Sequence, residues 1–265
     1  MADSKDKAWK SDRIARGNYN PSPIGKAIFI LARAADPFIQ YSILAHGTGG
    51  FLFHRLGLRT LPAGPPANTG IPAIDALGLS PARLVLLGMA VGSAAKQAIW
   101  AAWLGNEPIG TPMALSVAAF NTIFNSVSSY AFLLRATSAP LESTLALPEV
   151  LVGGILYVTG ILTELVSEVQ RKQFKADPKN KGKPYTGGLW SLARHINYGG
   201  YTVWRGGYAL VGGGWIMGAV VGAFFFADFA RRGVPTLNAY CEERYGEDWA
   251  KFKRQTKYRL IPGVY

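Results

Sequence analysis

A dense group of polar and aromatic residues between positions 168 and 198 has the chemistry of a site for an anionic ligand with a planar ring. Six Lys or Arg residues fall within positions 171–183, where only one acid, Asp177, accompanies them. Lys and Arg neutralise phosphates, an asparagine amide can pair with an amide or a ribose, and an aromatic ring stacks on a planar base. A glycine pair additionally lets the backbone approach a ligand closely. The residues that follow the cations are Gly187, Gly188, Trp190, Arg194, His195, Asn197 and Tyr198.

Each part of this pattern also has a simpler interpretation. The cationic stretch is typical of a cytosolic loop that binds anionic lipid headgroups. His195 could be a satisfied histidine at the start of a helix. Residues 240–255, YCEERYGEDWAKFKRQ, taken alone, predict an amphipathic helix on the membrane surface. The final Pro262–Tyr265 is unlike a solvated terminus and suggests a docked end. No GxGxxG or GKS/GKT motif occurs, so neither a Rossmann fingerprint nor a P-loop is indicated.

The composition favours a lipid environment for the elements that must position this site. Hydrophobic residues make up 49% of the chain and charged residues 17%, against about 25% charged in average soluble domains. The single Cys241 excludes a disulfide within the chain and a Cys-based zinc cluster, and the three histidines form no HExxH motif, so we expect no metal. The net charge of +12 is that of a membrane protein with basic cytosolic loops, and we expect no nucleic-acid partner.

Hydrophobic runs predict an all-α, polytopic integral membrane bundle of about six transmembrane helices. The last two spans are short and form a helical hairpin about Gly212–Gly214, and a cytosolic amphipathic tail follows them. Met1–Lys10 is polar and has no cleavable signal pattern, so we expect the first hydrophobic helix to target the protein to the membrane and stay there. The predicted spans are residues 24–46, 81–104, 112–134 and 147–166, with the hairpin within 198–230. Residues 24–46 contain Arg33 and Asp36, so this segment is either a span with a polar interior face or a helix at the membrane interface.

The distribution of Lys and Arg predicts that both termini lie in the cytosol. Residues 1–22 form a basic arm with Lys5, Lys7, Lys10, Arg13 and Arg16, and the C-terminal tail is also basic, whereas residues 60–78 contain no Lys or Arg. An even number of spans puts the basic segments on one side of the membrane. We therefore divide the chain into a basic cytosolic arm (1–22), N-terminal transmembrane helices that form a lipophilic substrate pocket (23–167), and a C-terminal cofactor-binding region (168–265).

Polar residues inside the spans are candidates for contact with a substrate. An ionisable residue within a membrane span is a functional hypothesis by default, although a lysine can also snorkel to the surface. Asparagines can line a cavity or hold helices together. For Arg33 and Asp36 we expect a structural ion pair. The substrate-binding candidates are Lys96, Gln97, Asn121, Asn125 and Glu164.

Two C-terminal motifs resemble those of a known membrane superfamily. QRKQFKADPKNKGKPYTGGLWSLARHINYGGY is similar to a block of the steroid 5α-reductase-like proteins, and YCEERYGEDWAKFKRQTKYRLIPGVY is similar to the end of the sterol reductases. Isoprenylcysteine carboxyl methyltransferases share the same layout, with a related Arg-His element. The resemblance covers about the last hundred residues, while the earlier part matches only in being helical and membranous.

The resemblance implies an NADPH-dependent oxidoreductase of the endoplasmic reticulum that reduces a carbon–carbon double bond in a steroid-, sterol- or terpenoid-like enone or olefin. Hydride delivery to an enone needs a donor that stabilises the enolate oxygen, and we expect Tyr198 or Tyr201 to do so, with His195 tuning one of them. The cofactor-binding residues implied by motif position are Lys172, Lys175, Trp190, Arg194, His195, Asn197, Tyr198, Tyr245, Trp249, Tyr258 and Arg259.

One departure from the family pattern keeps other chemistries open. The family places an acid after Asn-Tyr-x-Gly, where this chain has Tyr201. Glu164 or Glu168 could reach the same cavity. The alternatives are an S-adenosylmethionine-dependent methyltransferase of the isoprenylcysteine carboxyl methyltransferase type, a double-bond isomerase, and a lipid-binding relative without turnover. The sequence identifies neither the lipophilic small-molecule substrate nor an oligomeric state.

Overall fold

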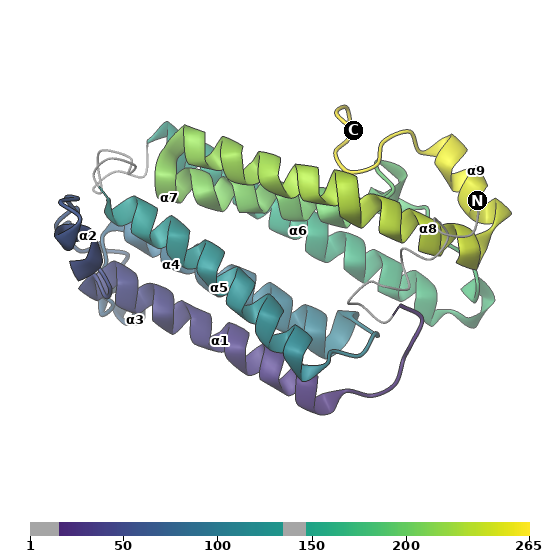
Figure 1. Cartoon of the computed structure of the whole chain (residues 1–265), viewed down its shortest axis with the longest axis horizontal. Helices are drawn as coiled ribbons and strands as arrows, with labels where there is room; N and C mark the ends of the chain where they lie inside the picture. Colours follow the sequence, from purple (N-terminus) through teal and green to yellow (C-terminus); the bar gives the residue numbers. More distant parts are fainter. Residues whose placement is uncertain (1–15, 135–146) are drawn as a thin grey trace.

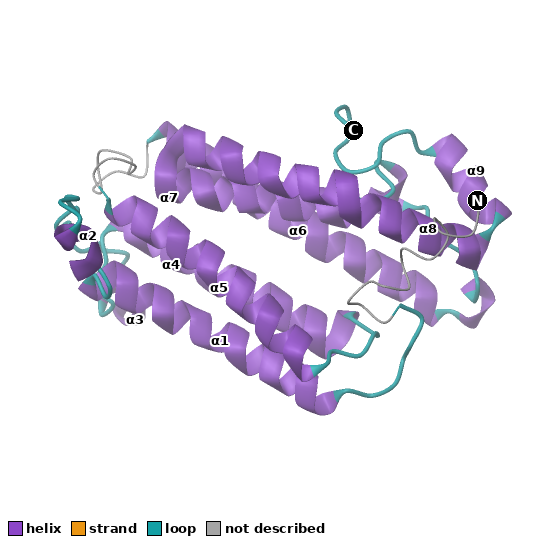
Figure 2. Ribbon diagram, in the orientation of Figure 1, coloured by secondary structure: helices purple, strands orange, loops and turns teal. Residues whose placement is uncertain are grey.

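A computed structural model describes residues 16–134 and 147–265 as a bundle of helices that run roughly along one long axis (Figures 1 and 2). Within these ranges the only β pairing is an isolated bridge between Thr60 and Leu134. Lys5, Lys7, Lys10 and Arg13 of the basic arm lie outside the described residues. The elements are α1 (Pro23–His46), α2 (Phe51–Arg55), α3 (Pro72–Asp75), α4 (Pro81–Ile99) continued by the π-helical turn η2 (Trp100–Leu104), α5 (Thr111–Leu133), α6 (Pro148–Ala176), η3 (Pro178–Asn180), η4 (Gly188–Ser191), α7 (Ile196–Asp228), η5 (Phe229–Gly233), α8 (Val234–Tyr245) and α9 (Glu247–Gln255).

The all-α membrane bundle predicted from the sequence is confirmed. Four stretches of the described chain are long and apolar enough to cross a membrane: Pro23–His46, Pro81–Leu104, Pro148–Ala176 and Ile196–Tyr245. The last contains both of the short spans expected in that region. Helix α5 matches the remaining expected span in position but is not among the four, because its Asn and Ser side chains lower its mean hydropathy. The number of spans therefore stays a prediction.

The hairpin predicted at the triple glycine is present inside α7. The backbone leaves helical geometry at Gly213 and Gly214, and Gly214 has a φ of +76°, which a glycine adopts without strain. The two arms pack closely, since a Cβ added to Gly206 would lie 3.4 Å from the carbonyl oxygen of Gly218. Figure 1 shows the second arm returning beside the first toward α8. Small residues thus let the arms meet without bulky side chains between them.

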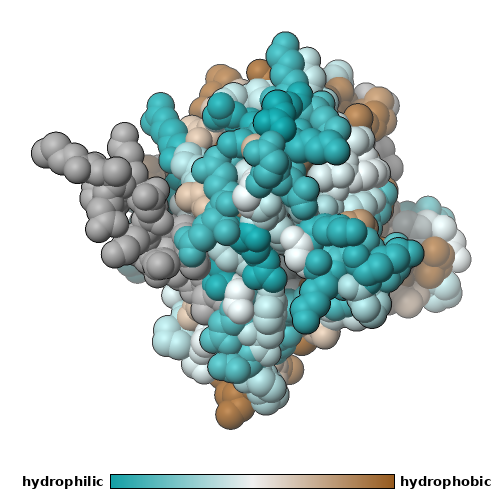
Figure 3. Space-filling model, turned by 90° about the vertical axis from the view of Figure 1, so that its right-hand side faces the viewer, coloured by the Kyte–Doolittle hydropathy of each residue, from teal (hydrophilic) through white to brown (hydrophobic). Residues whose placement is uncertain are grey.

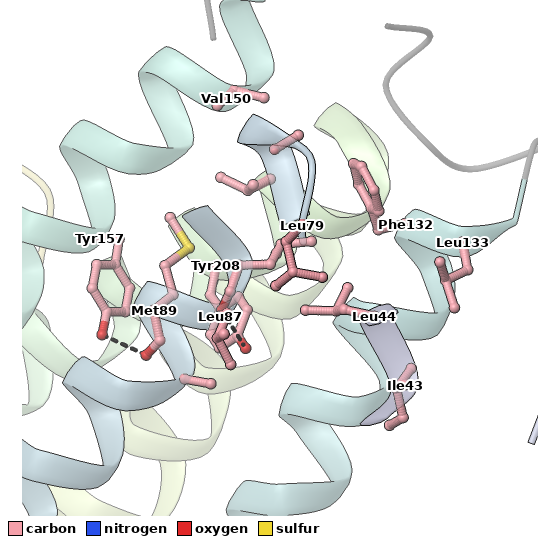
Figure 4. Packing of buried hydrophobic residues seen from close by; sticks show 14 of the residues in the cluster. Ile43, Leu44, Leu79, Leu87, Met89, Phe132, Leu133, Val150, Tyr157 and Tyr208 are labelled. Atoms are coloured by element: carbon pink, nitrogen blue, oxygen red, sulfur yellow. Dashed lines mark hydrogen bonds between the residues drawn. The ribbon is translucent and has the colours of Figure 1, made fainter. Parts of the chain in front are cut away.

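The main hydrophobic core occupies the end of the bundle opposite α8 and α9. Leu44 of α1, Leu86 of α4 and Phe132 of α5 are fully buried there. Figure 4 shows the tyrosines of this cluster directing their hydroxyls at helix carbonyls: Tyr157 donates to Met89 O at 2.7 Å and Tyr208 to Leu86 O at 3.3 Å. The core of this half is thus packed with apolar side chains, and its tyrosine hydroxyls are satisfied within the protein.

The other end of the bundle is hydrophilic. Viewed end-on, with α8 and α9 toward the reader, most of the surface is polar (Figure 3). Helix α6 extends ten residues beyond the predicted end at 166, so Arg171, Lys172 and Lys175 lie on its last turns and not in a loop. The last turns of α6 are charged and extend beyond its apolar part. Because their backbone groups are hydrogen-bonded within the helix, the helix can continue where the apolar residues end.

The C-terminal tail folds back onto this end as two helices that meet at Gly246. Trp249 and Phe252 are only 4% and 1% exposed and pack with Trp190 and Ile196. Their rings therefore do not lie at headgroup level, as the surface-helix interpretation required. The docked end predicted for Pro262–Tyr265 is present only in part: Tyr265 packs on Phe226 with ring centres 5.6 Å apart, whereas Val264 is 70% exposed, and the preceding Leu260 is fully buried. The backbone amides of residues 259 and 260 also donate to the carbonyl oxygen of Tyr265 at 2.7 and 2.8 Å.

Candidate functional site

A cavity of about 340 Å³ lies between the N-terminal helices and the α6–α7 pair, at the hydrophilic half of the bundle. Two other hollows, of about 380 and 430 Å³, have one charged lining residue between them, Lys26, and offer no comparable chemistry. The lining of the cavity comprises ten charged or polar residues (Arg16, Lys96, Gln97, Glu107, Glu164, Glu168, Arg171, Asn197, Arg232, Thr236), five aromatic residues (Phe29, Trp100, Tyr198, Tyr201, Phe229) and Ile109, Met113, Val117, Gly233 and Leu237.

Glycines set the distance between the two helices that carry most of the polar lining. A Cβ on Gly160 of α6 would lie 2.4 Å from the backbone nitrogen of Trp204, and one on Gly200 of α7 would lie 2.7 Å from the carbonyl oxygen of Gly160. Such distances exclude any side chain at these positions. The close approach brings Glu164 and Glu168, one turn apart on α6, against the start of α7.

Lys96 and Glu164 form an ion pair across the cavity wall, from α4 to α6. The second oxygen of the Glu164 carboxylate accepts a hydrogen bond from the indole nitrogen of Trp204 at 2.8 Å. The Lys96 ammonium also lies 5.8 Å from the ring centres of Tyr201 and Trp204. Lys96 is only 6% exposed, so it does not snorkel to the surface. A charge inside a membrane bundle needs such partners, because hydrocarbon cannot solvate it.

Glu168 joins α6 to the Arg-His-x-Asn motif at the start of α7. One carboxylate oxygen accepts from Asn197 Nδ2 at 2.9 Å, and the other accepts from Arg171. Because a carboxylate only accepts, the amide of Asn197 is oriented with its nitrogen toward Glu168. Its carbonyl oxygen is then buried beside the cavity without a hydrogen-bond partner. This oxygen is a candidate acceptor for a ligand.

The inner side of the cavity rests on a buried polar network that ties four helices together. Asn121 Oδ1 accepts from Gln97 Nε2 at 2.7 Å and from Arg205, and the Tyr201 hydroxyl lies 3.4 Å from it. Arg205 also donates to Asn125 Oδ1 at 2.8 Å and to the Tyr201 hydroxyl at 3.2 Å. Asn121 and Asn125 thus hold helices together and do not line the cavity.

The network continues into α1. Asn125 Nδ2 donates to Asp36 at 2.6 Å, and the same carboxylate pairs with Arg33 at 3.2 Å. Both Arg33 and Asp36 are fully buried, which confirms the expected structural ion pair. The guanidinium of Arg205 faces the Trp204 ring at 4.2 Å. Because the Arg205 guanidinium is held in this position, its hydrogen bond to the Tyr201 hydroxyl fixes the orientation of that hydroxyl at the cavity wall.

The predicted cofactor residues fall into two groups. Asn197 and Tyr198 line the cavity together with the predicted Lys96, Gln97, Glu164 and Tyr201. Tyr198 stacks on Phe229 with ring centres 4.5 Å apart. The remaining predicted residues lie outside the lining: Lys172, Lys175, Trp190, Arg194, His195, Tyr245, Trp249, Tyr258 and Arg259.

The cations at the end of α6 have aromatic and protein partners. Lys172 lies 5.9 Å from the Trp103 ring, and Lys175 donates to the Tyr245 hydroxyl at 3.2 Å. The indole nitrogen of Trp190 donates to Ser167 O at 2.8 Å, so this ring is a structural part of the α6–η4 contact.

The segment after α9, residues 256–265, packs against the start of α7 and is called the C-terminal strap. The backbone amides of Arg194 and His195 donate to the carbonyls of Tyr258 and Arg259 at 3.0 and 2.8 Å, and the Arg194 side chain donates to Thr256 O. Arg259 itself donates to the Tyr265 hydroxyl at 2.8 Å. The contacts of the strap with residues 194 and 195 thus determine where α7 begins.

His195 is 1% exposed and neither ring nitrogen has a partner. Its ring lies 6.0 Å from that of Trp249 and 6.1 Å from that of Tyr198, just behind the cavity wall. Burial, together with the positive charge of Arg194, lowers the pKa of His195 to about 3. The imidazole is therefore neutral at physiological pH.

Several residues of the site were not among the predicted ones. Arg205 carried a usable signal, since an arginine within an apolar helix marks a functional or structural centre. Arg171 was counted only as part of the basic stretch. Arg16, Glu107 and Arg232 reach the cavity from three separate parts of the chain, and no local pattern links them.

Comparison with known proteins extends the resemblance beyond the C-terminal motifs. The family model described as "Protein of unknown function (DUF1295)" matches residues 110–256, which include α5 and α6. The chain is 42% identical over 252 residues to the probable O-methyltransferase ustE of Ustilaginoidea virens, a match that covers 92% of this chain and 89% of that protein. The similarity to this relative therefore reaches the N-terminal helices, beyond the region that resembles the sterol reductases.

Sterol reductases match over a shorter region. The Delta(14)-sterol reductase of Schizosaccharomyces pombe is 32% identical over 115 residues, which are 36% of this chain and 26% of the reductase. The 7-dehydrocholesterol reductase of Danio rerio is 29% identical over 87 residues, 32% of this chain and 18% of that one. By name, the relatives are enzymes of two classes, sterol reductases and an O-methyltransferase. The chain belongs to the DUF1295 family of steroid 5α-reductase-like membrane proteins.

Proposed function

We propose that this protein is an integral membrane enzyme that transfers a methyl group from S-adenosylmethionine to an oxygen atom of a lipophilic acceptor. The observation that carries the proposal is the charge pattern of the cavity. Three of its four cations already have carboxylate partners: Lys96 pairs with Glu164, Arg171 with Glu168 and Arg232 with Asp228. The lysines at the end of α6 lie outside the lining. A dinucleotide phosphate would find few cations to neutralise its phosphates there.

The same lining fits S-adenosylmethionine. S-adenosylmethionine carries a cationic sulfonium and ammonium, ribose hydroxyls that donate hydrogen bonds, and a single anionic group, its carboxylate, where NADPH has three phosphates. The cavity offers the Glu168 carboxylate, the open carbonyl oxygen of Asn197 and the rings of Tyr198 and Tyr201. Aromatic faces attract cations, most strongly where water is excluded. The volume of about 340 Å³ is near the lower end of the range for small-molecule sites, roughly 300 to 1,000 Å³, and favours one nucleoside over two.

Each group of cavity residues has a distinct role in the proposed methyl transfer. When bound, S-adenosylmethionine supplies an electrophilic methyl group. Glu168 and Asn197 accept hydrogen bonds from the cofactor's donors, and Arg171 holds Glu168 in place. Lys96 holds the Glu164 carboxylate in place within the wall. Phe29, Trp100 and Val117 exclude water from the acceptor side. The proposal keeps the division into an N-terminal substrate pocket and a C-terminal cofactor region.

Sequence similarity favours this function as well. The probable O-methyltransferase of Ustilaginoidea virens is similar along nearly the whole chain, including the N-terminal helices that would bind the acceptor. Tyr201 stands where the family pattern has an acid, and methyl transfer needs no group there to protonate a carbon.

NADPH-dependent reduction of a lipophilic double bond is the second candidate. It is favoured by the similarity of the C-terminal region to sterol reductases, and by the basic end of α6, where Lys172 and Lys175 could bind phosphates beside the cavity. In this case Tyr201, whose hydroxyl is oriented by Arg205, is the candidate proton donor. Tyr198 and His195 would support it from the same wall.

Cofactor binding separates the two candidates. The protein in lipid nanodiscs should bind tritiated S-adenosylmethionine, and Asn197→Ala should weaken this binding at least tenfold. Asn68→Ala, at an exposed position in the connection before α4, is the matched control and should bind normally. Quenching of NADPH fluorescence without binding of S-adenosylmethionine would support the reductase instead. Binding of neither cofactor would overturn both.

We also propose that the hydrophilic end of the bundle faces the cytosol, as expected for an enzyme of the endoplasmic reticulum with cytosolic termini. The support is the basic end of α6, where Arg171, Lys172 and Lys175 lie, at the hydrophilic end of the bundle (Figure 3). An N-glycosylation site inserted at exposed Asn68 should be modified in microsomes, and one inserted after Tyr265 should not be.

A further inference from the structure

The cavity has two unlike walls. One wall, from α6 and α7, carries Glu164, Glu168 and Asn197, while the other, from α1, α4 and α5, is mostly apolar. On the apolar wall Gln97 is the only uncharged polar side chain among the described lining residues of these three helices. It is 6% exposed, so its hydrogen bonds must come from the protein or from a ligand.

The amide of Gln97 has a defined orientation with one atom unsatisfied. Nε2 donates to Asn121 Oδ1 at 2.7 Å, and this oxygen can only accept, so the nitrogen and oxygen of Gln97 cannot be exchanged. Gln97 Oε1 is buried and has no hydrogen-bond partner. An unpaired buried acceptor costs about 1–3 kcal/mol, and a donor in the cavity would recover this.

The groups next to Gln97 disfavour an anionic ligand. The Tyr201 hydroxyl already bridges Arg205 Nε, at 3.2 Å, and Asn121 Oδ1, at 3.4 Å, and its oxygen can accept but has no second proton to give. The neighbouring Lys96 is neutralised by Glu164. A carboxylate has no proton to donate, so beside Gln97 it would leave Oε1 unpaired and set a second acceptor oxygen against it at low dielectric. A neutral hydroxyl carries no such penalty.

We propose that the methyl acceptor is a neutral lipophilic alcohol or phenol whose O–H donates to Gln97 Oε1, and not a carboxylic acid. This inference rests on the proposed methyl transfer. In the reaction an O–CH₃ bond forms at the hydroxyl oxygen and the S–CH₃ bond of the donor breaks, with its electron pair left on sulfur. As the O–CH₃ bond forms, the hydroxyl proton leaves its hydrogen bond with Gln97 Oε1 for a carboxylate of the lining, Glu164 or Glu168, and passes from there to water.

Matched probes test the acceptor class without a cofactor. Binding of 2-naphthol, naphthalene and 2-naphthoate to the protein in nanodiscs is measured by equilibrium dialysis at neutral pH, with empty nanodiscs subtracted. A hydrogen bond to a buried acceptor predicts that 2-naphthol binds about five- to tenfold more tightly than naphthalene. We expect 2-naphthoate to bind more weakly than naphthalene. Tighter binding of 2-naphthoate than of 2-naphthol overturns the proposal, and so does equal binding of 2-naphthol and naphthalene.

Substitution of Gln97 locates the effect. Gln97→Met keeps the length of the side chain and removes the acceptor, so the preference for 2-naphthol over naphthalene should fall to within about twofold. Gln173→Met, on the exposed face of α6, should leave the preference intact. A preference that survives Gln97→Met places the hydroxyl elsewhere and overturns the assignment. If Gln97→Met does not fold, the three probes on the native protein still decide.

Competition distinguishes this inference from the proposed function. S-adenosylhomocysteine should leave the 2-naphthol affinity unchanged or improve it, because the two ligands occupy different walls. Displacement of 2-naphthol by S-adenosylhomocysteine would assign Gln97 to the cofactor and sink the inference, while the proposed function would stand. Absence of S-adenosylmethionine binding would sink the proposed function, whatever the naphthalene series shows.

Discussion

The ammonium of Lys96 and the carboxylate of Glu164 meet inside the bundle, one from α4 and one from α6, and the indole of Trp204 donates to the same carboxylate at 2.8 Å. This pair joins the N-terminal helices to the C-terminal region that carries the family motifs. It also places two opposite charges side by side in the cavity wall, next to the unpaired oxygen of Gln97 on which the proposed preference for a hydroxyl rests.

Removal of one partner of this pair should destabilise the protein strongly. Lys96→Met leaves the Glu164 carboxylate buried and uncompensated, at a cost on the order of 3 kcal/mol. The double variant Lys96→Met/Glu164→Gln should recover most of this loss. Unfolding in detergent can be followed with a thiol-reactive dye, because the single cysteine, Cys241, is buried. Equal stability of the single and double variants would contradict the assigned ion pair.

The stability of the protein should fall in acid because of His195. The folded pKa of about 3 lies below the usual value of about 6.5, so between these values only the unfolded chain takes up the proton. The free energy of unfolding should therefore decrease as the pH falls from about 6 to about 3, by up to about 1.4 kcal/mol per pH unit from this group. Above pH 7 the group should contribute no pH dependence.

Comparison of two histidine variants measures this contribution. His195→Gln should reduce the slope of stability against pH in the acid range. His54→Gln changes an exposed histidine of α2 and should leave the slope as in the native protein. An unchanged acid slope in His195→Gln would mean that the imidazole is not buried in its neutral form.

Two glycines of α6 should respond oppositely to the same substitution. At Gly160 a Cβ would lie 2.4 Å from the backbone nitrogen of Trp204, so Gly160→Ala should force α6 and α7 apart and cost several kcal/mol. At Gly154 nothing lies within 4 Å, and Gly154→Ala should be neutral or stabilise the helix by about 0.5–1 kcal/mol. Melting temperatures in detergent check both. Similar values for the two variants would refute the α6–α7 contact.

Tyr201→Phe should separate the two candidate reactions. In methyl transfer the hydroxyl only completes the bonding of Arg205 and Asn121, so the rate should fall by less than about tenfold, in line with one lost hydrogen bond. If the protein were a reductase with Tyr201 as proton donor, the loss should reach about 10²–10⁴-fold. Turnover with the identified cofactor provides the measurement. The control is Tyr130→Phe, near the C-terminal end of α5 and outside the cavity lining.

Much of the architecture followed from local sequence signals. Apolar runs predicted the membrane helices within one or two residues for residues 81–104 and 112–134, and the glycines at 212–214 predicted the turn within α7. The expected end of α6 was ten residues too early, because a helix can continue past the apolar region when its last turns are charged and solvated. Hydropathy indicates which residues suit the bilayer, but it does not show where the helix ends.

The membership of the cavity was less predictable. Asn197, Tyr198 and Tyr201 came from a motif, and Lys96 and Glu164 from their unusual place in apolar helices. Trp190 and Arg194 belong to the same motif, but their polar atoms bond to Ser167 O and Thr256 O. A motif fixes which residues are neighbours along the chain, while the direction of each side chain depends on contacts from elsewhere.

The sequence by itself determined that this is a helical membrane protein of the steroid 5α-reductase-like superfamily, since composition, hydropathy and ordered motifs are local properties. Only the tertiary structure decided which charges are free for a ligand. Lys96 and Glu164 are 68 residues apart in the chain, and Arg194 and its partner Thr256 are 62 residues apart. Both contacts depend on how the helices pack. Charge compensation inside a bundle is a property of the fold, because it depends on distances between helices that no local pattern encodes.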